Sequence, residues 1–206
     1  RAAFARHYLD TLGAILRELP INELARAMGL LEEAFETRRQ VFLAGNGGSA
    51  STASHMANDL MKGVAKSRGR GVRAVALADN LSVLTAIAND EAYADVFSSQ
   101  LIELAQPGDV LVVFSGSGNS ANILRALEAA RQLRMTTIGF LGMGGGEAAK
   151  IVDVAVIVPS DAYGPIEDTH LVFDHLITAY LRSRTQHSGA ASSRPHPAAA
   201  AGPRGG

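Results

Sequence analysis

Hydrophobic and polar positions follow two patterns along this chain, one typical of helices and one typical of buried strands. Between residues 2 and 39, apolar side chains recur every three or four positions, as from Leu24 through Met28 to Leu31. This spacing predicts two helices, over 2–17 and 21–39, separated at Pro20. Short apolar runs then predict strands at 40–44, 72–77, 109–114, 135–140 and 153–158. Further helical patterns cover 48–62, 80–88, 94–105, 119–133, 145–150 and about 165–184.

The regular alternation of strand and helix indicates an α/β fold. Repeated β–α–β units build a parallel sheet with right-handed crossovers. We therefore expect a three-layer α/β/α domain whose five-stranded parallel sheet is flanked by helices and preceded by two N-terminal helices. A single domain should cover residues 1–184. The tail over 185–206 is rich in Ala, Pro, Gly and Ser without periodicity, and we expect it to be disordered.

The two leading helices lie within residues 1–39, before the first strand, and are therefore not crossovers of the sheet. Their apolar stripes must be covered, either by wrapping around the chain's own sheet or by packing against a second subunit. The high Ala content and the small sheet favour the second alternative. We expect these helices to hold an oligomer together.

Composition narrows the functional classes. The 206 residues are 47% hydrophobic and 19% charged with a formal net charge of −1, so no basic field points to nucleic acid or to an anionic membrane. The absence of cysteine excludes disulfides, thiolate metal sites and cysteine nucleophiles. No apolar run approaches the ~20 residues that span a bilayer, and the first residues do not read as a signal peptide. We expect a cytoplasmic protein.

Two Gly- and Ser-rich segments give the strongest indication of chemistry. They cover residues 45–49 (Gly-Asn-Gly-Gly-Ser) and 115–120 (Ser-Gly-Ser-Gly-Asn-Ser), and each follows an apolar run and leads into a predicted helix. Small residues let backbone N–H groups approach an anion, hydroxyls add donors, and the helix dipole favours negative charge. Both segments should lie at the carboxyl ends of their strands, where parallel sheets bind ligands. The sequence therefore predicts a phosphorylated small molecule as the ligand.

Histidine and carboxylate side chains provide a second candidate site. His55 and Asp59 are four positions apart on a predicted helix, so they share a face and can chelate one ion. Imidazole together with carboxylate suits zinc. Glu167 and His175 are eight residues apart, ~12 Å along a helix axis, and reach one ion only if their side chains lean together or different subunits contribute. Taken alone, the His55–Asp59 pair is more typical of a plain helix surface than of a metal site.

These segments, together with His55, Asn89-Asp90 and residues 167–175, resemble a SIS (sugar isomerase) domain. More narrowly, they resemble the phosphoheptose isomerases, which interconvert sedoheptulose 7-phosphate and an aldoheptose 7-phosphate. The resemblance extends from the N-terminal helices to about Arg182, and a helical histidine six residues after Ser49 is specific for this branch, including its non-catalytic relatives. It implies a homotetramer built around the N-terminal helices, with active sites at subunit interfaces.

The resemblance also implies roles for individual residues. Those that contact the sugar or its phosphate are Asn46, Gly47, Ser49, Asp90, Ser115, Gly116, Ser117, Asn119 and Ser120. The acid and base groups are Asp59, where the family has a glutamate, and His175, with Glu167 as a further catalytic carboxylate. A zinc ion, one per subunit, is implied at His55, Asp59, Glu167 and His175.

Four positions depart from the family pattern. Asp59 replaces a glutamate, which shortens the arm by about 1.5 Å. Gly63 stands where relatives carry an arginine near the substrate, and Gly164 replaces an acidic residue before the last helix. Glu167 replaces the usual glutamine, and its added negative charge should tighten cation binding.

Two functional classes follow from the sequence. The first is an isomerase that exchanges an aldose and a ketose through a cis-enediolate. The second is a non-catalytic SIS module that binds sugar phosphates or partner proteins, as do relatives that associate with the replication initiator. Retention of His55, His175 and a carboxylate at position 59 favours the isomerase.

Overall fold

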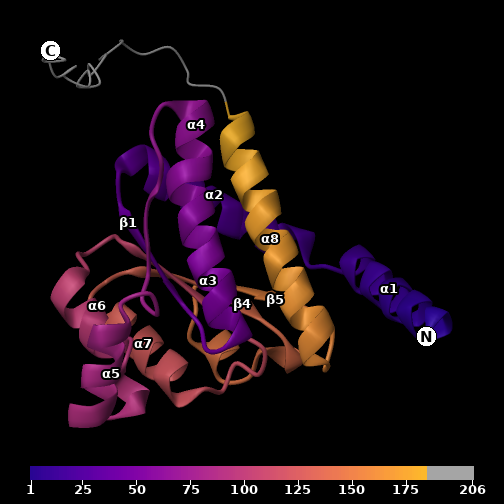
Figure 1. The fold of residues 1–206 in the computed structure, drawn as a ribbon. Helices are drawn as coiled ribbons and strands as arrows, with labels where there is room; N and C mark the ends of the chain where they lie inside the picture. The colour runs from indigo at the N-terminus through magenta and orange to yellow at the C-terminus, as the bar shows by residue number, and fades with distance from the viewer. Residues whose placement is uncertain (185–206) are drawn as a thin grey trace, which may run out of the picture.

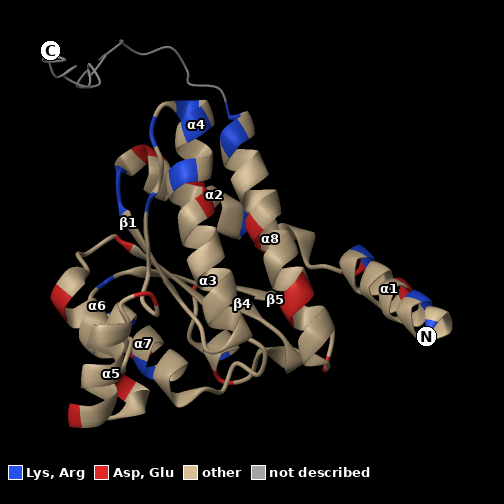
Figure 2. Ribbon diagram, in the orientation of Figure 1, with Lys and Arg blue, Asp and Glu red and all other residues tan. Residues whose placement is uncertain are grey.

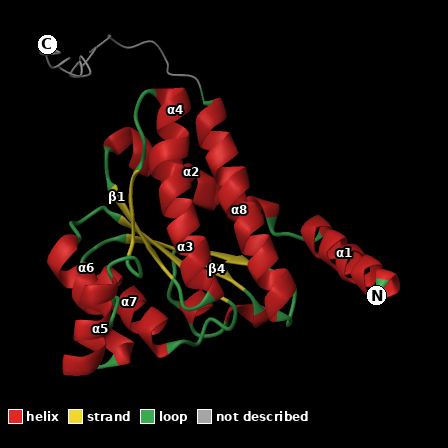
Figure 3. Ribbon diagram, in the orientation of Figure 1, coloured by secondary structure: helices red, strands yellow, loops and turns green. Residues whose placement is uncertain are grey.

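The computed structural model describes residues 1–184, which form a parallel sheet between two layers of helices (Figures 1 and 3). The strands are β1 (Gln40–Ala44), β2 (Arg73–Ala76), β3 (Val110–Ser115), β4 (Thr136–Leu141) and β5 (Val154–Ile157), in the spatial order β2-β1-β3-β4-β5. The α-helices are α1 (Ala2–Arg17), α2 (Ile21–Thr37), α3 (Gly48–Asn58), α4 (Val64–Arg68), α5 (Leu81–Asp90), α6 (Ser98–Leu104), α7 (Ala121–Gln132) and α8 (Tyr163–Ser183).

Alternation of side chains along the strands divides the core into two halves, one on each face of the sheet. Val112 and Phe114 of β3 face a cluster that includes residues of α2, α3, α4 and α8. Leu111 and Val113 face a second cluster that includes residues of α6 and α7. Because β1, β3 and β4 are nearly continuous apolar runs, the sheet requires cover on both faces. The predicted three-layer α/β/α fold, with five parallel strands and two leading helices, is confirmed.

Two helix predictions need correction. The helix expected over 48–62 continues to Arg68, because α3 passes through one π-helical turn at Asp59–Gly63 before α4 begins. The helix expected over 145–150 is wrong, since this region forms only short 3₁₀ turns at Met143–Gly145 and Ala148–Lys150. Its glycines take positive φ values, which a continuous right-handed helix excludes. The disorder predicted for 185–206 lies outside the described residues.

Helix α1 extends away from the sheet and meets the rest of the chain at the beginning of α8 (Figure 1). Its Tyr8 hydroxyl donates to Asp168 Oδ2 at 2.7 Å, and a Cβ at Gly164 would lie 2.9 Å from that hydroxyl. The neighbouring apolar side chains of Phe4 and Leu9 are exposed. Helix α5 likewise contributes no buried residue. No helix within residues 1–184 combines the length and apolar character required to cross a membrane.

Candidate active site and metal centre

The two Gly- and Ser-rich loops lie side by side. Strands β1 and β3 are adjacent and parallel, with Ala44 opposite Val113, so the segments that follow them emerge at one edge of the sheet. Each loop leads to a helix, the first into α3 at Gly48 and the second into α7 at Ala121. Neither loop contains Lys or Arg (Figure 2). The groups that these two loops offer to an anion are therefore hydroxyls, backbone N–H groups and the ends of helices.

Internal hydrogen bonds shape the second loop, residues 115–120. Gly118 N–H donates to Ser115 Oγ at 3.0 Å, and Asn119 N–H donates to Ser117 Oγ at 3.2 Å. Each hydroxyl oxygen accepts within the loop, so each hydroxyl proton remains free to be donated to a ligand. Ser120 occupies the N-cap position of α7 without capping it through its side chain. Gly118 has a φ of 65°, and a Cβ there would lie 2.0 Å from the carbonyl oxygen of Gly145.

The first loop is fixed to α7 by a pair of amide hydrogen bonds. Asn46 Nδ2 donates to Asn122 Oδ1 at 2.9 Å, and Asn122 Nδ2 donates back to Asn46 Oδ1 at 2.8 Å. The Tyr93 hydroxyl also donates to Asn46 Oδ1, at 3.0 Å. Asn122 and Tyr93 were not identified from the sequence. The signal for Asn122 was a polar residue on the apolar face of its helix, beside Ile123 and Ala126.

The first turns of α8 lie against both loops. The ring of Tyr163 contacts Gly116, since a Cβ on this glycine would lie 2.7 Å from the ring. Glu167 lies against Gly48, where a Cβ would lie 2.5 Å from Oε2. A larger residue at position 48 would therefore displace this carboxylate. Glu167 is therefore located beside the first turn of α3, at the sheet edge where both loops emerge.

Further along the same two helices, histidines and carboxylates converge. Helices α3 and α8 run side by side (Figure 1). His55 Nε2 lies 3.3 Å from His175 Nε2 and 3.6 Å from Asp59 Oδ2. The fourth member is Asp174, whose Oδ2 lies 3.8 Å from His55 Nε2. Within residues 1–184, these four side chains offer ligand atoms that all lie within 4.8 Å of one another.

Asp174 is unusual because it is a fully buried carboxylate. Its side chain has 0% exposure, and Oδ1 accepts from the Thr178 hydroxyl at 3.4 Å. Among the described residues no hydrogen-bond donor reaches Oδ2. Burial, and then the neighbouring Asp59 carboxylate, raise the pKa of Asp174 to about 6, against smaller opposing effects of His55 and His175. A side chain of this kind is stabilised by a bound proton or by a cation.

The structure thus brings together three of the four residues predicted as metal ligands. His55, Asp59 and His175 converge with Asp174, and Glu167 is not a member of this group. Gly63 lies beside this group, since a Cβ at this position would lie 3.6 Å from the Thr178 side chain. Asp90 is not a member of this group of histidines and carboxylates. It is exposed at the end of α5, where Asn89 Nδ2 donates to its Oδ1 at 2.7 Å.

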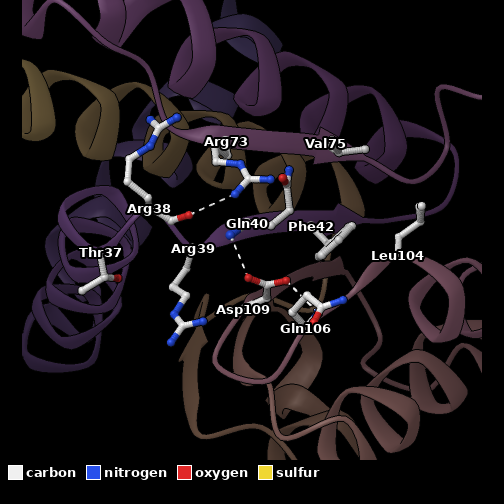
Figure 4. Close-up of a pocket in the computed structure, with 10 residues that line it drawn as sticks. All are labelled: Thr37, Arg38, Arg39, Gln40, Phe42, Arg73, Val75, Leu104, Gln106 and Asp109. Atoms are coloured by element: carbon white, nitrogen blue, oxygen red, sulfur yellow. Dashed lines mark hydrogen bonds between the residues drawn. The ribbon is translucent and has the colours of Figure 1, made fainter.

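A separate cavity of about 280 Å³ opens at the opposite, amino end of the strands (Figure 4). Asp109 accepts backbone N–H groups of Gln40 at 2.9 Å and Gln106 at 2.8 Å, so this carboxylate is engaged in holding the chain. The side chains of Arg38 and Arg39 point in opposite directions. The cavity does not direct its charged groups at one ligand. We therefore place the candidate active site at the carboxyl edge.

Comparison with known proteins finds relatives that align with most of the chain. A family model described as "SIS domain" matches residues 7–142. The phosphoheptose isomerase of Geotalea daltonii is 40% identical over 162 residues, which is 79% of this chain and 84% of the relative. That of Aliarcobacter butzleri is 35% identical over 190 residues, 91% of this chain and 100% of the relative. The structure of the Neisseria gonorrhoeae phosphoheptose isomerase superposes with a TM-score of 0.81 at 31% identity, covering 89% of this chain and 98% of that one.

Proposed function

The chain belongs to the SIS domain family and, within it, to the phosphoheptose isomerases, so it is a sugar-phosphate isomerase; we propose that it converts sedoheptulose 7-phosphate into an aldoheptose 7-phosphate. One observation supports this proposal above the others. A loop whose hydroxyl protons are free to bind a phosphate shares its sheet edge with the carboxylate of Glu167, and α3 and α8 lead from there to the His55–His175 pair.

The proposed reaction removes a proton from the carbon beside the carbonyl and returns it to the neighbouring carbon through a cis-enediolate. Ser115, Ser117 and Ser120 anchor the remote phosphate, with Gly116 and Asn119 shaping the loop. The sugar hydroxyls contact the first loop through Asn46, Gly47 and Ser49, with Asp90 as a further contact. Glu167 or Asp59 takes the proton as the base, and His175 transfers protons between the substrate oxygens. Binding energy from the phosphate then holds the reacting carbons against these groups.

We also propose one Zn²⁺ per subunit, held by His55, Asp59 and His175. Two imidazole nitrogens 3.3 Å apart, with carboxylate oxygens beside them, fit a shared cation, and two histidines with carboxylate suit zinc. The bound ion supplies Lewis-acid polarisation of substrate oxygens. The family resemblance implied Glu167 as a fourth ligand. Its carboxylate lies beside Gly48, and we propose that it acts on the substrate directly.

We propose that the protein is a homotetramer with active sites at the subunit interfaces. Helix α1 exposes Phe4 and Leu9, and α5 buries none of its residues within the single chain. Exposed apolar side chains grouped on one helix are typical of subunit interfaces. Because phosphorylated sugars are metabolites of the cytoplasm, the proposed reaction would take place there.

The test is direct detection of product. Purified protein is incubated with sedoheptulose 7-phosphate, and the aldoheptose 7-phosphate is followed by NMR without a coupling enzyme. Unphosphorylated sedoheptulose is the matched control, because it lacks only the group assigned to residues 115–120. We expect turnover of sedoheptulose 7-phosphate and none of unphosphorylated sedoheptulose. Binding of the sugar phosphate without turnover would instead support the non-catalytic SIS module.

A further inference from the structure

Asp174 lies on the buried side of α8, where the neighbouring positions are apolar. Phe173 and Ile177 have 0% exposure, and both belong to the core between α8 and the sheet. An ionised carboxylate at such a position costs free energy unless a cation or several donors satisfy it. Thr178 provides one donor to Oδ1, and no described residue provides one to Oδ2. The free oxygen is the one that approaches His55.

The distances from His55 Nε2 to the other ligand atoms are close to those around a small tetrahedral cation. In a tetrahedron with bonds of about 2.0–2.2 Å, typical of zinc with nitrogen and oxygen ligands, neighbouring ligand atoms are about 3.3–3.6 Å apart. From His55 Nε2 the distances are 3.3 Å to His175 Nε2, 3.6 Å to Asp59 Oδ2 and 3.8 Å to Asp174 Oδ2. The distance to Asp174 exceeds this range by a small amount, and all four ligand atoms lie within 4.8 Å of one another, so small side-chain rotations would bring them to the spacing of one ion.

We propose that Asp174 is the fourth protein ligand of the metal ion, so that each chain holds the ion with two histidines and two aspartates of its own. This inference rests on the metal site proposed above, but not on the identity of the sugar. It also accounts for the short arm of Asp59. A second carboxylate from α8 approaches the ion where Asp59 alone would reach less far than the glutamate expected at this position.

Glu167 is a poor alternative within the same chain. It precedes His175 by eight residues, which places it about 12 Å away along the axis of α8. Its carboxylate lies against Gly48, which is seven residues before His55 on α3. Asp174 is adjacent to His175 and already lies within the cluster. The two carboxylates of α8 therefore have separate roles, one at the loops and one at the ion.

The test compares metal binding by three variants that each neutralise one carboxylate of α8. Asp174→Asn removes the charge of the proposed ligand, Glu167→Ala removes the alternative, and Asp168→Asn is the matched control, because Asp168 bonds Tyr8 outside the cluster. Zinc affinity is measured by isothermal titration on metal-free protein, and cobalt(II) absorption reports the coordination geometry. Circular dichroism verifies that each variant is folded.

We expect wild-type protein to bind one ion per chain, with the intense visible absorption of tetrahedral cobalt. Asp174→Asn should weaken zinc binding at least about 10-fold and change the cobalt spectrum, whereas the other two variants stay within about 3-fold of wild type. A loss in Glu167→Ala with none in Asp174→Asn would overturn the assignment. The assignment would also be overturned if wild-type protein bound no metal. If such metal-free protein still turned over the sugar phosphate, the isomerase proposal would remain intact.

A second measurement keeps the inference testable if Asp174→Asn fails to fold. Zinc-edge X-ray absorption of Glu167→Ala protein counts the ligands that remain. Two imidazole nitrogens and two carboxylate oxygens are expected, because Asp59 and Asp174 are both intact. Loss of one oxygen donor in this variant would assign the fourth position to Glu167 and refute the role of Asp174.

Discussion

Replacing Asp174 with Asn should stabilise the metal-free protein at neutral pH while it weakens metal binding. The substitution keeps the shape of the side chain and removes a charge that is buried with one oxygen unpartnered. Natural metal ligands commonly cost stability when the ion is absent, since mutual repulsion between them is then uncompensated. Here the repulsion comes from Asp59, which helps to raise the pKa of Asp174.

The magnitude follows from the shift in pKa. The pKa of Asp174 rises from an ordinary value of 3.8 to about 6 in the folded protein, which corresponds to about 3 kcal/mol once the group is fully ionised. Because the folded pKa is the higher one, the folded state binds more protons between these two values. The contribution of Asp174 to stability is therefore fully present below about pH 4 and is lost as the pH rises through about 6. Asn does not titrate, so the variant does not lose this stability as the pH rises.

The assay is thermal unfolding of EDTA-treated wild type and Asp174→Asn from pH 4 to pH 8 at one protein concentration. The two proteins should unfold at similar temperatures near pH 4. The variant should gain about 6–12 °C by pH 7, given about 2–4 °C per kcal/mol for a chain of this size. Asp168→Asn should show no such pH-dependent gain. An Asp174→Asn variant that is less stable than wild type at pH 7, or whose difference from wild type is constant with pH, would refute the reasoning.

Three further predictions concern the loops and the assembly. Ser117→Ala should raise KM for the sugar phosphate about 10- to 150-fold, because a lost hydroxyl donor to a charged oxygen costs roughly 1.5–3 kcal/mol, and steady-state kinetics with an unchanged KM would place the phosphate elsewhere. Gly48→Ala should displace the Glu167 carboxylate, because the new Cβ would lie 2.5 Å from it. We expect a lower kcat with little change in unfolding temperature, and a normal kcat would show that Glu167 has no part in the reaction. Light scattering should find a tetramer that Leu9→Asp dissociates, and a wild-type monomer would contradict the shared active site.

The sheet could be predicted from the sequence because its strands are buried on both faces. Runs such as 110–114 leave no helical alternative of that length, and each strand was placed within a few residues. The turn at Met143–Lys150 could not be predicted so easily, because its Ala and Lys residues favour a helix. Positive φ at Gly144, Gly145 and Gly146 determines the outcome, and an ideal Cβ at Gly146 would lie 2.4 Å from the carbonyl oxygen of Ser117.

The candidate site was predicted less completely than the fold. Helical spacing placed His55 and Asp59 on one face, and the resemblance added His175, but neither addressed which faces of α3 and α8 meet. Asp174 had a detectable signal, since a charged residue at the buried positions of an apolar helix requires a reason. The eight-residue spacing from His175 indicated that Glu167 lies apart, but its position against Gly48 had no signal, because it depends on where α8 contacts α3.

The central claim is that this chain moves a proton between neighbouring carbons of a phosphorylated sugar. Its most direct test is isomerisation of sedoheptulose 7-phosphate in deuterated water, with NMR used to locate the label. We predict that solvent deuterium enters at C2 of the aldose product, or at C1 of the recovered ketose, and at no other carbon, and that His175→Asn abolishes this exchange while remaining folded. Product formed without any label at these carbons, or an unchanged rate of exchange in His175→Asn, would contradict the account.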